Sequence, residues 1–177
     1  MKKLISLAVV FVLLLSLCAC VSEPTLVGTA PANNSESTAP TSPSEKTFKL
    51  GEVVELDGVT VSLISVDKSK GSQFNKPADE NEFVLCEFEI SNNSTEELSV
   101  SSMLSFEAYC DDYACEYSIS ALMEKGSKDQ LDGSVAPGKK MKGVIGYEVS
   151  KDWNTIEIQY TPDIWTGSKI VFIATNE

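Results

Sequence analysis

The stretch "EFVLCEFEIS", Glu82–Ser91, is the clearest strand signal in the chain. Apolar side chains occupy its alternate positions: Val84, Cys86, Phe88 and Ile90. The acidic residues Glu87 and Glu89 lie between them on the opposite side. Successive side chains of a β-strand point to opposite faces, so this alternation predicts a strand with one face in a core and the other in water.

A hairpin precedes this strand in "GEVVELDGVTVSLISV", Gly51–Val66. Asp57-Gly58 lies between two apolar segments, and this pair favours a type I′ turn because both central positions of that turn need a positive φ. The second segment begins with alternating apolar residues, but Ile64 and Val66 interrupt its pattern. The hairpin and the strand after it predict the first part of a sheet.

The rest of the chain continues as short extended segments separated by turns. "FEAYCDDYACEYSI", residues 106–119, predicts a second hairpin, and Pro137-Gly138 and Thr161-Pro162-Asp163 are typical turn sequences. Only Ser120–Gln130 could form a turn or two of helix. This spacing predicts an all-β fold, an immunoglobulin-like antiparallel β-sandwich of about seven to nine strands. The Cys…Trp…Cys spacing of a true immunoglobulin domain is missing.

The N-terminus has the pattern of a secretion signal. Met1-Lys2-Lys3 is positively charged, and Leu4–Leu17 is an uncharged apolar run, shorter than the roughly 20 residues of a membrane-spanning helix. Leu17-Cys18-Ala19-Cys20 then resembles a bacterial lipobox. This motif implies removal of residues 1–19, a diacylglyceryl group on Cys20, and lipid anchoring at the extracytoplasmic face of the cell membrane. Modification of Cys18 instead would place the bulky Leu17 at the cleavage position, and metal binding by a bare C-x-C lacks a third ligand.

Residues 20–47 are expected to form the lipidated cysteine and a flexible linker. Val21–Thr47 holds four of the seven prolines and few large apolar side chains. Such a segment cannot bury enough surface to offset the entropy of ordering it, and as a flexible chain it would span about 30 Å. The folded domain is therefore predicted to occupy residues 48–177.

The order of these segments resembles an uncharacterised family of secreted bacterial lipoprotein domains. The resemblance covers about residues 48–175, and its most specific part is the Pro137-Gly138 turn that leads to Gly143 and Tyr147. Members join a lipobox and a linker to an immunoglobulin-like sandwich similar to mycobacterial immunoprotective extracellular antigens. The cysteines at positions 110 and 115 depart from the family pattern. The resemblance implies the fold, and it implies no catalytic residues.

Charge and composition exclude several kinds of function. The net charge is −12, with 26 acidic residues, and the sequence contains neither Arg nor His. Nucleic acid is excluded as a partner because phosphate binding depends on clustered basic side chains. Motifs of serine hydrolases, P-loops and dinucleotide sites are absent, and a Cys or Ser nucleophile would lack a histidine base. We therefore expect no enzyme activity, no cofactor and no metal site. Two alternatives remain. One is weak calcium binding by acidic runs such as Asp79–Glu82 and Asp129–Gly133. The other is a hydrolase or small-ligand carrier with a carboxylate-lined cleft.

Three cysteines remain in the domain once Cys20 carries lipid. If "CDDYAC" turns at Asp112-Tyr113, Cys110 lies opposite Cys115 in a non-hydrogen-bonded pair, whose Cα separation of about 4.5 Å a disulfide can span. We therefore predict a Cys110–Cys115 disulfide, with a redox-active dithiol as the alternative. Cys86, on the apolar face of its strand, is expected to be a buried free thiol.

Two aromatic residues in loops are candidate binding residues. Phe74 lies in the polar segment "DKSKGSQFNKPADENE", and Trp165 lies in "TPDIWTGSK" between two strands. Loops at the ends of such sandwiches carry recognition, although either ring could instead fold back onto the core. Trp153 and Tyr109 are predicted to be core residues. The chain is thus interpreted as a lipid-anchored binding or envelope-structural module, whose partner could be an envelope protein or the cell wall.

Overall fold

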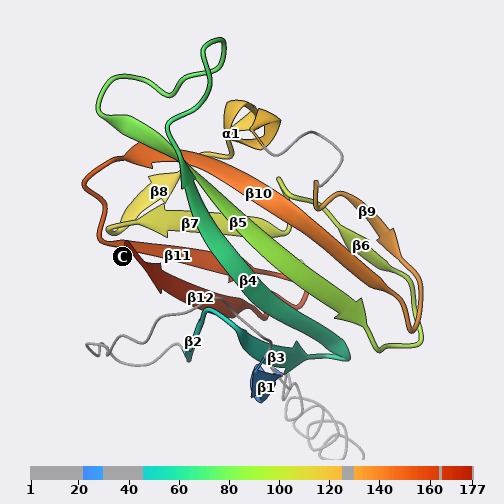
Figure 1. Cartoon of the computed structure of the whole chain (residues 1–177). Helices are drawn as coiled ribbons and strands as arrows, with labels where there is room; N and C mark the ends of the chain where they lie inside the picture. The colour runs from blue at the N-terminus through green and yellow to red at the C-terminus, as the bar shows by residue number, and fades with distance from the viewer. Residues whose placement is uncertain (1–21, 30–45, 125–129, 164, 177) are drawn as a thin grey trace, which may run out of the picture.

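The computed structural model describes residues 22–29, 46–124, 130–163 and 165–176 (Figure 1). The predicted signal peptide and Cys20 lie outside these residues. The described part contains twelve strands and one short helix: β1 Thr25–Thr29, β2 Thr47–Lys49, β3 Glu52–Leu56, β4 Val59–Ser69, β5 Asn81–Asn92, β6 Leu98–Val100, β7 Phe106–Cys110, β8 Tyr113–Cys115, α1 Ile119–Met123, β9 Gly133–Val135, β10 Lys140–Ser150, β11 Thr155–Tyr160 and β12 Ile170–Thr175. The prediction of an all-β domain is confirmed, and the helix begins one residue before the segment in which it was expected.

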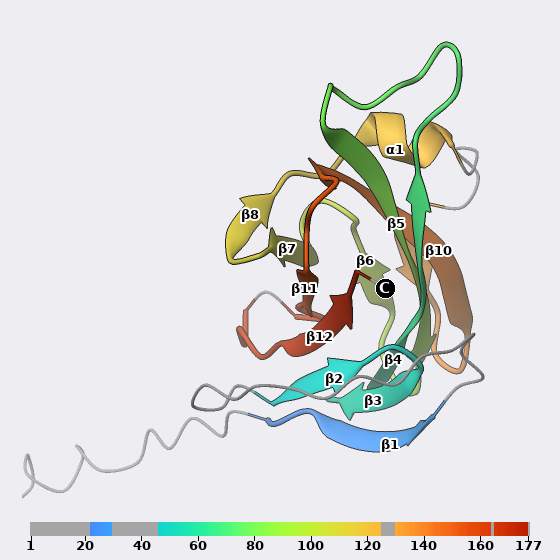
Figure 2. The same ribbon diagram turned by 60° about the vertical axis from the view of Figure 1, so that its left-hand side comes forward.

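Two five-stranded sheets pack face to face (Figure 2). The first has the order β1-β3-β4-β5-β10, and the second has the order β2-β12-β11-β7-β8. Strands β6 and β9 form a small two-stranded sheet beside them. The pairing is antiparallel except that β2 is parallel to β12. The number of strands exceeds the predicted seven to nine because β2, β6, β8 and β9 have only three residues each, too few to produce a visible alternation.

Aromatic side chains fill the space between the sheets. Phe88 of β5 contacts Phe106 and Phe172 of the opposite sheet, with ring centroids 5.3 and 5.8 Å apart. Phe172 in turn contacts Phe48, and Phe106 contacts Tyr160 at 4.8 Å. All five rings are buried. The interior of the sandwich is therefore a packed core, as the alternation in Glu82–Ser91 predicted.

The hairpin at Asp57-Gly58 has the predicted geometry. The two residues have φ values of 52° and 78°, and Leu56 pairs with Val59 across the turn. The register of β4 against β5 shifts between Leu63 and Ser65. This irregularity explains why Ile64 interrupts the alternation, since one extra residue in a strand reverses the faces of the residues after it.

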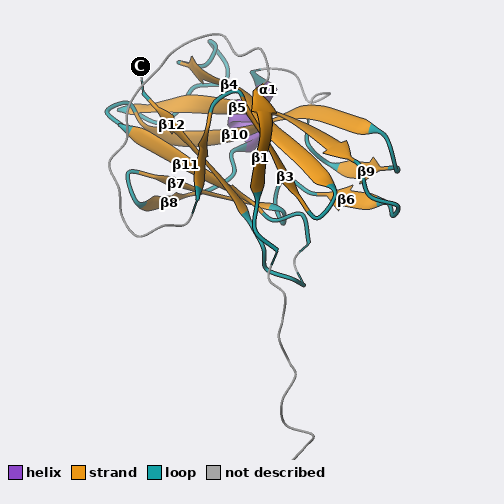
Figure 3. Cartoon of the chain, turned by 90° about the horizontal axis from the view of Figure 1, so that it is seen from below, coloured by secondary structure: helices purple, strands orange, loops and turns teal. Residues whose placement is uncertain are grey.

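Helix α1 covers the outer face of the first sheet near the start of β5 (Figure 3). Phe83 and Leu85 of β5 pack there against Ala121 and Leu122, so this end of β5 is buried on both faces. Gly146 permits the close approach, because a Cβ at this position would lie only 2.7 Å from the Cβ of Ala121. Farther along the outer face the side chains are polar, and Lys142 and Lys140 pair with Glu87 and Glu89 at 3.1 and 2.8 Å.

Part of the segment predicted to be a flexible linker belongs to the sheet. Strand β1, Thr25–Thr29, pairs antiparallel with β3, with Thr25 opposite Glu55 and Thr29 opposite Glu52. The expectation of a flexible linker throughout residues 20–47 is therefore wrong for this strand. All five residues of β1 are exposed, so burial gives them no sequence pattern, and backbone pairing with an edge strand holds them instead.

Candidate functional site

The loop between β4 and β5 presents Phe74 to solvent. The ring is 94% exposed, although the loop around it is held by several hydrogen bonds. Ser72 N donates to Asn75 O at 2.8 Å, and Gly71 N donates to Ser69 Oγ at 3.0 Å. At its far end, Ala78 N donates to Glu148 Oε1 at 2.8 Å. Phe74 is therefore an exposed aromatic side chain on a structured loop and does not fold back onto the core. Its role as a binding residue stays a prediction.

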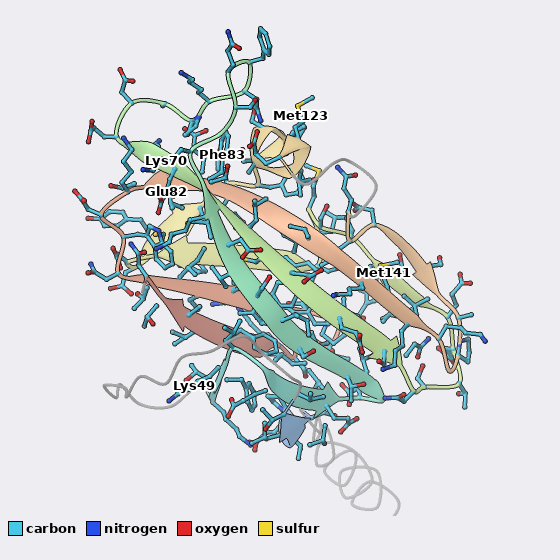
Figure 4. All side chains as sticks on the ribbon, viewed as in Figure 1. Lys49, Lys70, Glu82, Phe83, Met123 and Met141 are labelled. Carbon is cyan, nitrogen blue, oxygen red and sulfur yellow. The ribbon has the colours of Figure 1, made fainter. Side chains whose placement is uncertain are left out.

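The same loop is joined to α1. Asn75 Nδ2 donates to the carbonyl of Ser120 and to Glu124 Oε1, both at 2.7 Å. Two apolar residues of α1, Ile119 and Met123, are each 66% exposed next to these anchoring residues. Figure 4 shows Met123 on this side of the molecule, beside the loop that begins at Lys70. We call Phe74, Ile119 and Met123 the Phe74 surface.

Trp165 lies at the opposite end of the sandwich, in the loop between β11 and β12. Its side chain is 90% exposed, so the ring does not plug the core. Asp163 orders the loop: its Oδ1 accepts from Trp165 N at 2.9 Å, and its carbonyl accepts from Thr166 Oγ1 at 3.1 Å. Trp153, by contrast, is buried, and its Nε1 donates to Glu82 Oε1 at 2.9 Å. The core prediction is confirmed for Trp153 and wrong for Tyr109, which is only half-buried at the end of β7.

Trp165 lines a groove of about 750 Å³ at this end of the molecule. Leu104, which is 75% exposed, lines it as well, as does Ser22 from the N-terminal segment. Four carboxylates also line it: Asp57, Glu96, Glu97 and Asp163. We call it the Trp165 groove. It lies between loops at the end of the sandwich and does not penetrate between the sheets, where the aromatic core fills the interior.

The three domain cysteines are free thiols, so the predicted Cys110–Cys115 disulfide is wrong. The hairpin turns at Asp111-Asp112, where both residues have positive φ, and not at Asp112-Tyr113. This one-residue change places Cys110 opposite Tyr113, and Cys115 opposite Ala108. The two cysteines are therefore diagonal neighbours, not a directly facing pair.

The surroundings of the thiols do not favour reactivity. Burial, and to a lesser extent the neighbouring Cys110 thiol, raise the pKa of Cys115 to about 12. Burial also raises the pKa of Cys110. Cys86 is completely buried, as expected, and burial raises its pKa further still. A redox-active dithiol needs a lowered pKa, so these shifts oppose that alternative.

The acidic runs do not form a metal centre in the described part of the chain. No three His, Cys, Asp or Glu side chains come together there in an arrangement that could hold a metal ion. Asp111 instead binds backbone, with its carboxylate accepting from Asn154 N and Thr155 N at 3.0 and 2.8 Å. These hydrogen bonds lower the pKa of Asp111. No described helix is long and apolar enough to cross a membrane.

Comparison with solved structures shows the same fold in other bacterial proteins. A Bacillus subtilis "putative lipoprotein (ycdA)" superposes with a TM-score of 0.56 at 20% identity, covering 67% of this chain and 37% of that one. The yjhA protein of Bacillus subtilis gives 0.55 at 16% identity, covering 70% of this chain and 96% of that one. A functionally unknown protein from Listeria monocytogenes gives 0.50 at 13% identity, with 70% and 80% covered. The chain thus spans little more than a third of the first of these proteins.

Family comparison gives a match over most of the folded domain. No curated protein matches the chain. The family model described as domain of unknown function (DUF4352) matches residues 48–170, which include β3–β11 and the Phe74 surface. Because this match extends over more than half of the chain, the protein belongs to the DUF4352 family.

Proposed function

We propose that this protein is an extracytoplasmic lipoprotein, held to the membrane by a diacylglyceryl group on Cys20, whose β-sandwich binds a protein partner through the Phe74 surface. The lipobox at Leu17–Cys20 supports the anchor. A solved relative that is named as a lipoprotein candidate supports it as well. Two acyl chains suffice for stable anchoring, because each buried methylene contributes about 0.8 kcal/mol and one chain alone binds only marginally.

The exposure of Phe74 is the observation that carries the binding proposal. A large apolar side chain that is 94% exposed gains by leaving water, and burying a Phe ring contributes about 1.5–3 kcal/mol. The hydrogen bonds from Asn75 to Ser120 and Glu124 hold the loop before any partner arrives, which lowers the entropy cost of association. Ile119 and Met123 extend the apolar area next to it. These features are typical of an anchor residue at a protein interface.

A non-enzymatic role agrees with the same residues. The sequence has no histidine and no nucleophile motif, and the raised pKa of Cys115 leaves little thiolate at neutral pH. The interior of the sandwich is filled by the aromatic core. We therefore propose a binding module in preference to a hydrolase or a ligand carrier.

Fractionation of cells tests the anchor. Cys20→Ser should move the protein from the membrane fraction to the soluble extracytoplasmic fraction. Cys18→Ser is the matched control: it lies two residues away in the segment that cleavage removes, and it should leave the protein with the membrane. A Cys20→Ser protein that stays in the membrane fraction would contradict the anchor.

Site-specific crosslinking in intact cells tests the binding surface. A photoreactive amino acid at position 74 should give a discrete crosslinked product, and the same group at Asp112, an exposed residue in the β7–β8 turn, should not. Excess purified domain should compete for that product, and excess Phe74→Ser domain should not. Equal products from both positions, or equal competition by both domains, would refute the role of Phe74.

A further inference from the structure

We infer that the Trp165 groove is a membrane-docking surface: this end of the sandwich rests on the bilayer, with Trp165 and Leu104 in the lipid headgroup layer and the Phe74 surface directed away. The inference rests on the proposed function, because it requires the diacylglyceryl group on Cys20. It adds to that function an orientation of the sandwich on the membrane and a second interaction surface, which contacts the lipid bilayer.

Only a short length of chain separates the lipid from the groove. Ser22 lines the groove and lies two residues after Cys20. An extended chain spans at most about 3.5 Å per residue, so the lipidated cysteine lies within roughly 7 Å of Ser22. A lipid on Cys20 would therefore be attached within two residues of a groove-lining side chain.

The pairing of β1 with β3 keeps this distance short. β1 begins at Thr25 and is paired with β3 from that residue onward. Most of the predicted linker, residues 30–46, follows β1 in the sequence and so does not lie between the lipid and the sandwich. It joins β1 to β2, two strands of the folded body, and cannot act as a stalk that lifts the domain from the membrane.

Topology then decides which end faces the bilayer. Thr25 pairs with Glu55, next to the Asp57-Gly58 turn, so the chain enters β1 at the end of the sandwich where that turn lies. Asp57, the segment 94–99 and the β11–β12 loop with Trp165 line the groove at this end. The loop that carries Phe74 leaves the opposite end of β4, above the sheets in Figures 1 and 2.

The exposed side chains at this end suit a bilayer interface. Tryptophan is enriched at the boundary between lipid headgroups and acyl chains because its ring is apolar and its indole N–H can hydrogen bond. Trp165 is 90% exposed and Leu104 75% exposed, and both line the same groove as Ser22. In water these two side chains would remain unburied, whereas a bilayer held at the groove by Cys20 would cover them.

The charge of the groove predicts a lipid preference. Its four carboxylates are Asp57, Glu96, Glu97 and Asp163. Anionic headgroups would repel this excess of negative charge, and salt would screen the repulsion. We therefore expect the Trp165 groove to lie closer to zwitterionic bilayers than to anionic ones at low salt.

Fluorescence quenching in vesicles tests the orientation. The full-length lipidated protein is reconstituted in phosphatidylcholine vesicles that contain lipids brominated on the acyl chains near the headgroup. The Trp165→Phe variant gives the background emission of buried Trp153. Subtracting it from the emission of the wild type leaves the emission of Trp165. We expect the lipid quencher to reduce that emission by at least half. In the Trp165→Phe, Phe74→Trp variant, the new tryptophan should retain its emission, because it points away from the bilayer.

The outcomes separate the inference from the proposed function. If the protein floats with the vesicles but the Trp165 emission is not quenched, the docking surface is refuted while the anchor stands. If the tryptophan at position 74 is quenched and Trp165 is not, the orientation is reversed and the inference is also refuted. If the protein purified from cells carries no lipid and does not float with the vesicles, the anchor itself fails. Equal quenching in phosphatidylcholine and phosphatidylglycerol vesicles at low salt would refute the role of the carboxylates.

Discussion

Replacement of Asn92 by Ala should destabilise the sandwich strongly, although this residue resembles an ordinary turn residue in the sequence. Asn92 is fully buried at the end of β5. Its Nδ2 donates to the carbonyls of Glu96 and Val135, both at 2.7 Å. Its Oδ1 accepts from Ser94 N at 3.0 Å and from Ser94 Oγ at 2.7 Å. One side chain thus fixes the loop that lines the Trp165 groove and ties it to β9.

The magnitude follows from these four hydrogen bonds. Each contributes about 0.5–1.5 kcal/mol, and a buried partner left without its donor adds a further cost, so we expect a loss of about 3–5 kcal/mol of unfolding free energy. For a domain of this size the melting temperature should fall by roughly 10–15 °C. Asn93→Ala is the matched control, because Asn93 is exposed and its side chain makes a single hydrogen bond, with Thr60 Oγ1. We expect it to cost less than about 1 kcal/mol.

Urea unfolding of the soluble Cys20→Ser protein, followed by circular dichroism, measures both variants. Similar unfolding free energies for Asn92→Ala and Asn93→Ala, or a loss below about 1 kcal/mol for Asn92→Ala, would refute the assignment of Asn92 as the residue that holds this loop.

Gly146→Ala should lower the free energy of unfolding by about 1–3 kcal/mol, because the added Cβ would meet Ala121. Gly28→Ala is the control, since no atom lies near its Cβ position, and it should leave the melting temperature unchanged. Equal melting temperatures for the two variants would contradict the packing of α1. A thiol assay on the unreduced, unfolded Cys18→Ser, Cys20→Ser protein should count three thiols, and a count of one would show that a disulfide forms. In the folded protein Cys86 should not react. Cys115, with its pKa raised to about 12, should react slowly until the pH becomes strongly alkaline. The lowered pKa of Asp111 means that its carboxylate stabilises the fold above about pH 4 and loses this effect as the pH falls through the folded-state pKa. In thermal melts from pH 6 to pH 2, the melting temperature of the wild type should therefore fall more than that of Asp111→Asn. Parallel curves of melting temperature against pH would contradict this role of Asp111.

The features that the sequence predicts well are those with a strong local cause. Asp57-Gly58 forms the expected turn because few residue pairs accept positive φ at both positions. The alternation around Phe88 identifies a core strand because one face of β5 packs against the other sheet.

The predictions that fail depend on contacts that no local pattern reveals. Asp111 and Asp112 both adopt positive φ, which is uncommon for residues other than glycine. This moved the hairpin register by one residue, so Cys110 and Cys115 are diagonal neighbours and not a directly facing pair. Thr25–Thr29 has no buried side, so its pairing with β3 leaves no periodicity in the sequence.

The candidate site could be predicted only in part. Phe74 and Trp165 stand out as aromatic residues in polar loops, and both are exposed. Ile119 and Met123 were not anticipated, because their exposure depends on how α1 lies against the sheet. The neighbourhood of Ser22 and Trp165 joins residues far apart in the chain, and only the pairing of β1 with β3 brings them to one groove.

The most direct test of the account is mass spectrometry of the mature protein purified from bacterial membranes. We predict that the N-terminal peptide begins at Cys20 and carries the mass of a diacylglyceryl group on its sulfur, with no peptide from residues 1–19. An N-terminal peptide that still contains Cys18, or one that begins at Cys20 without lipid, would contradict the anchor and, with it, the placement of the Trp165 groove on the bilayer.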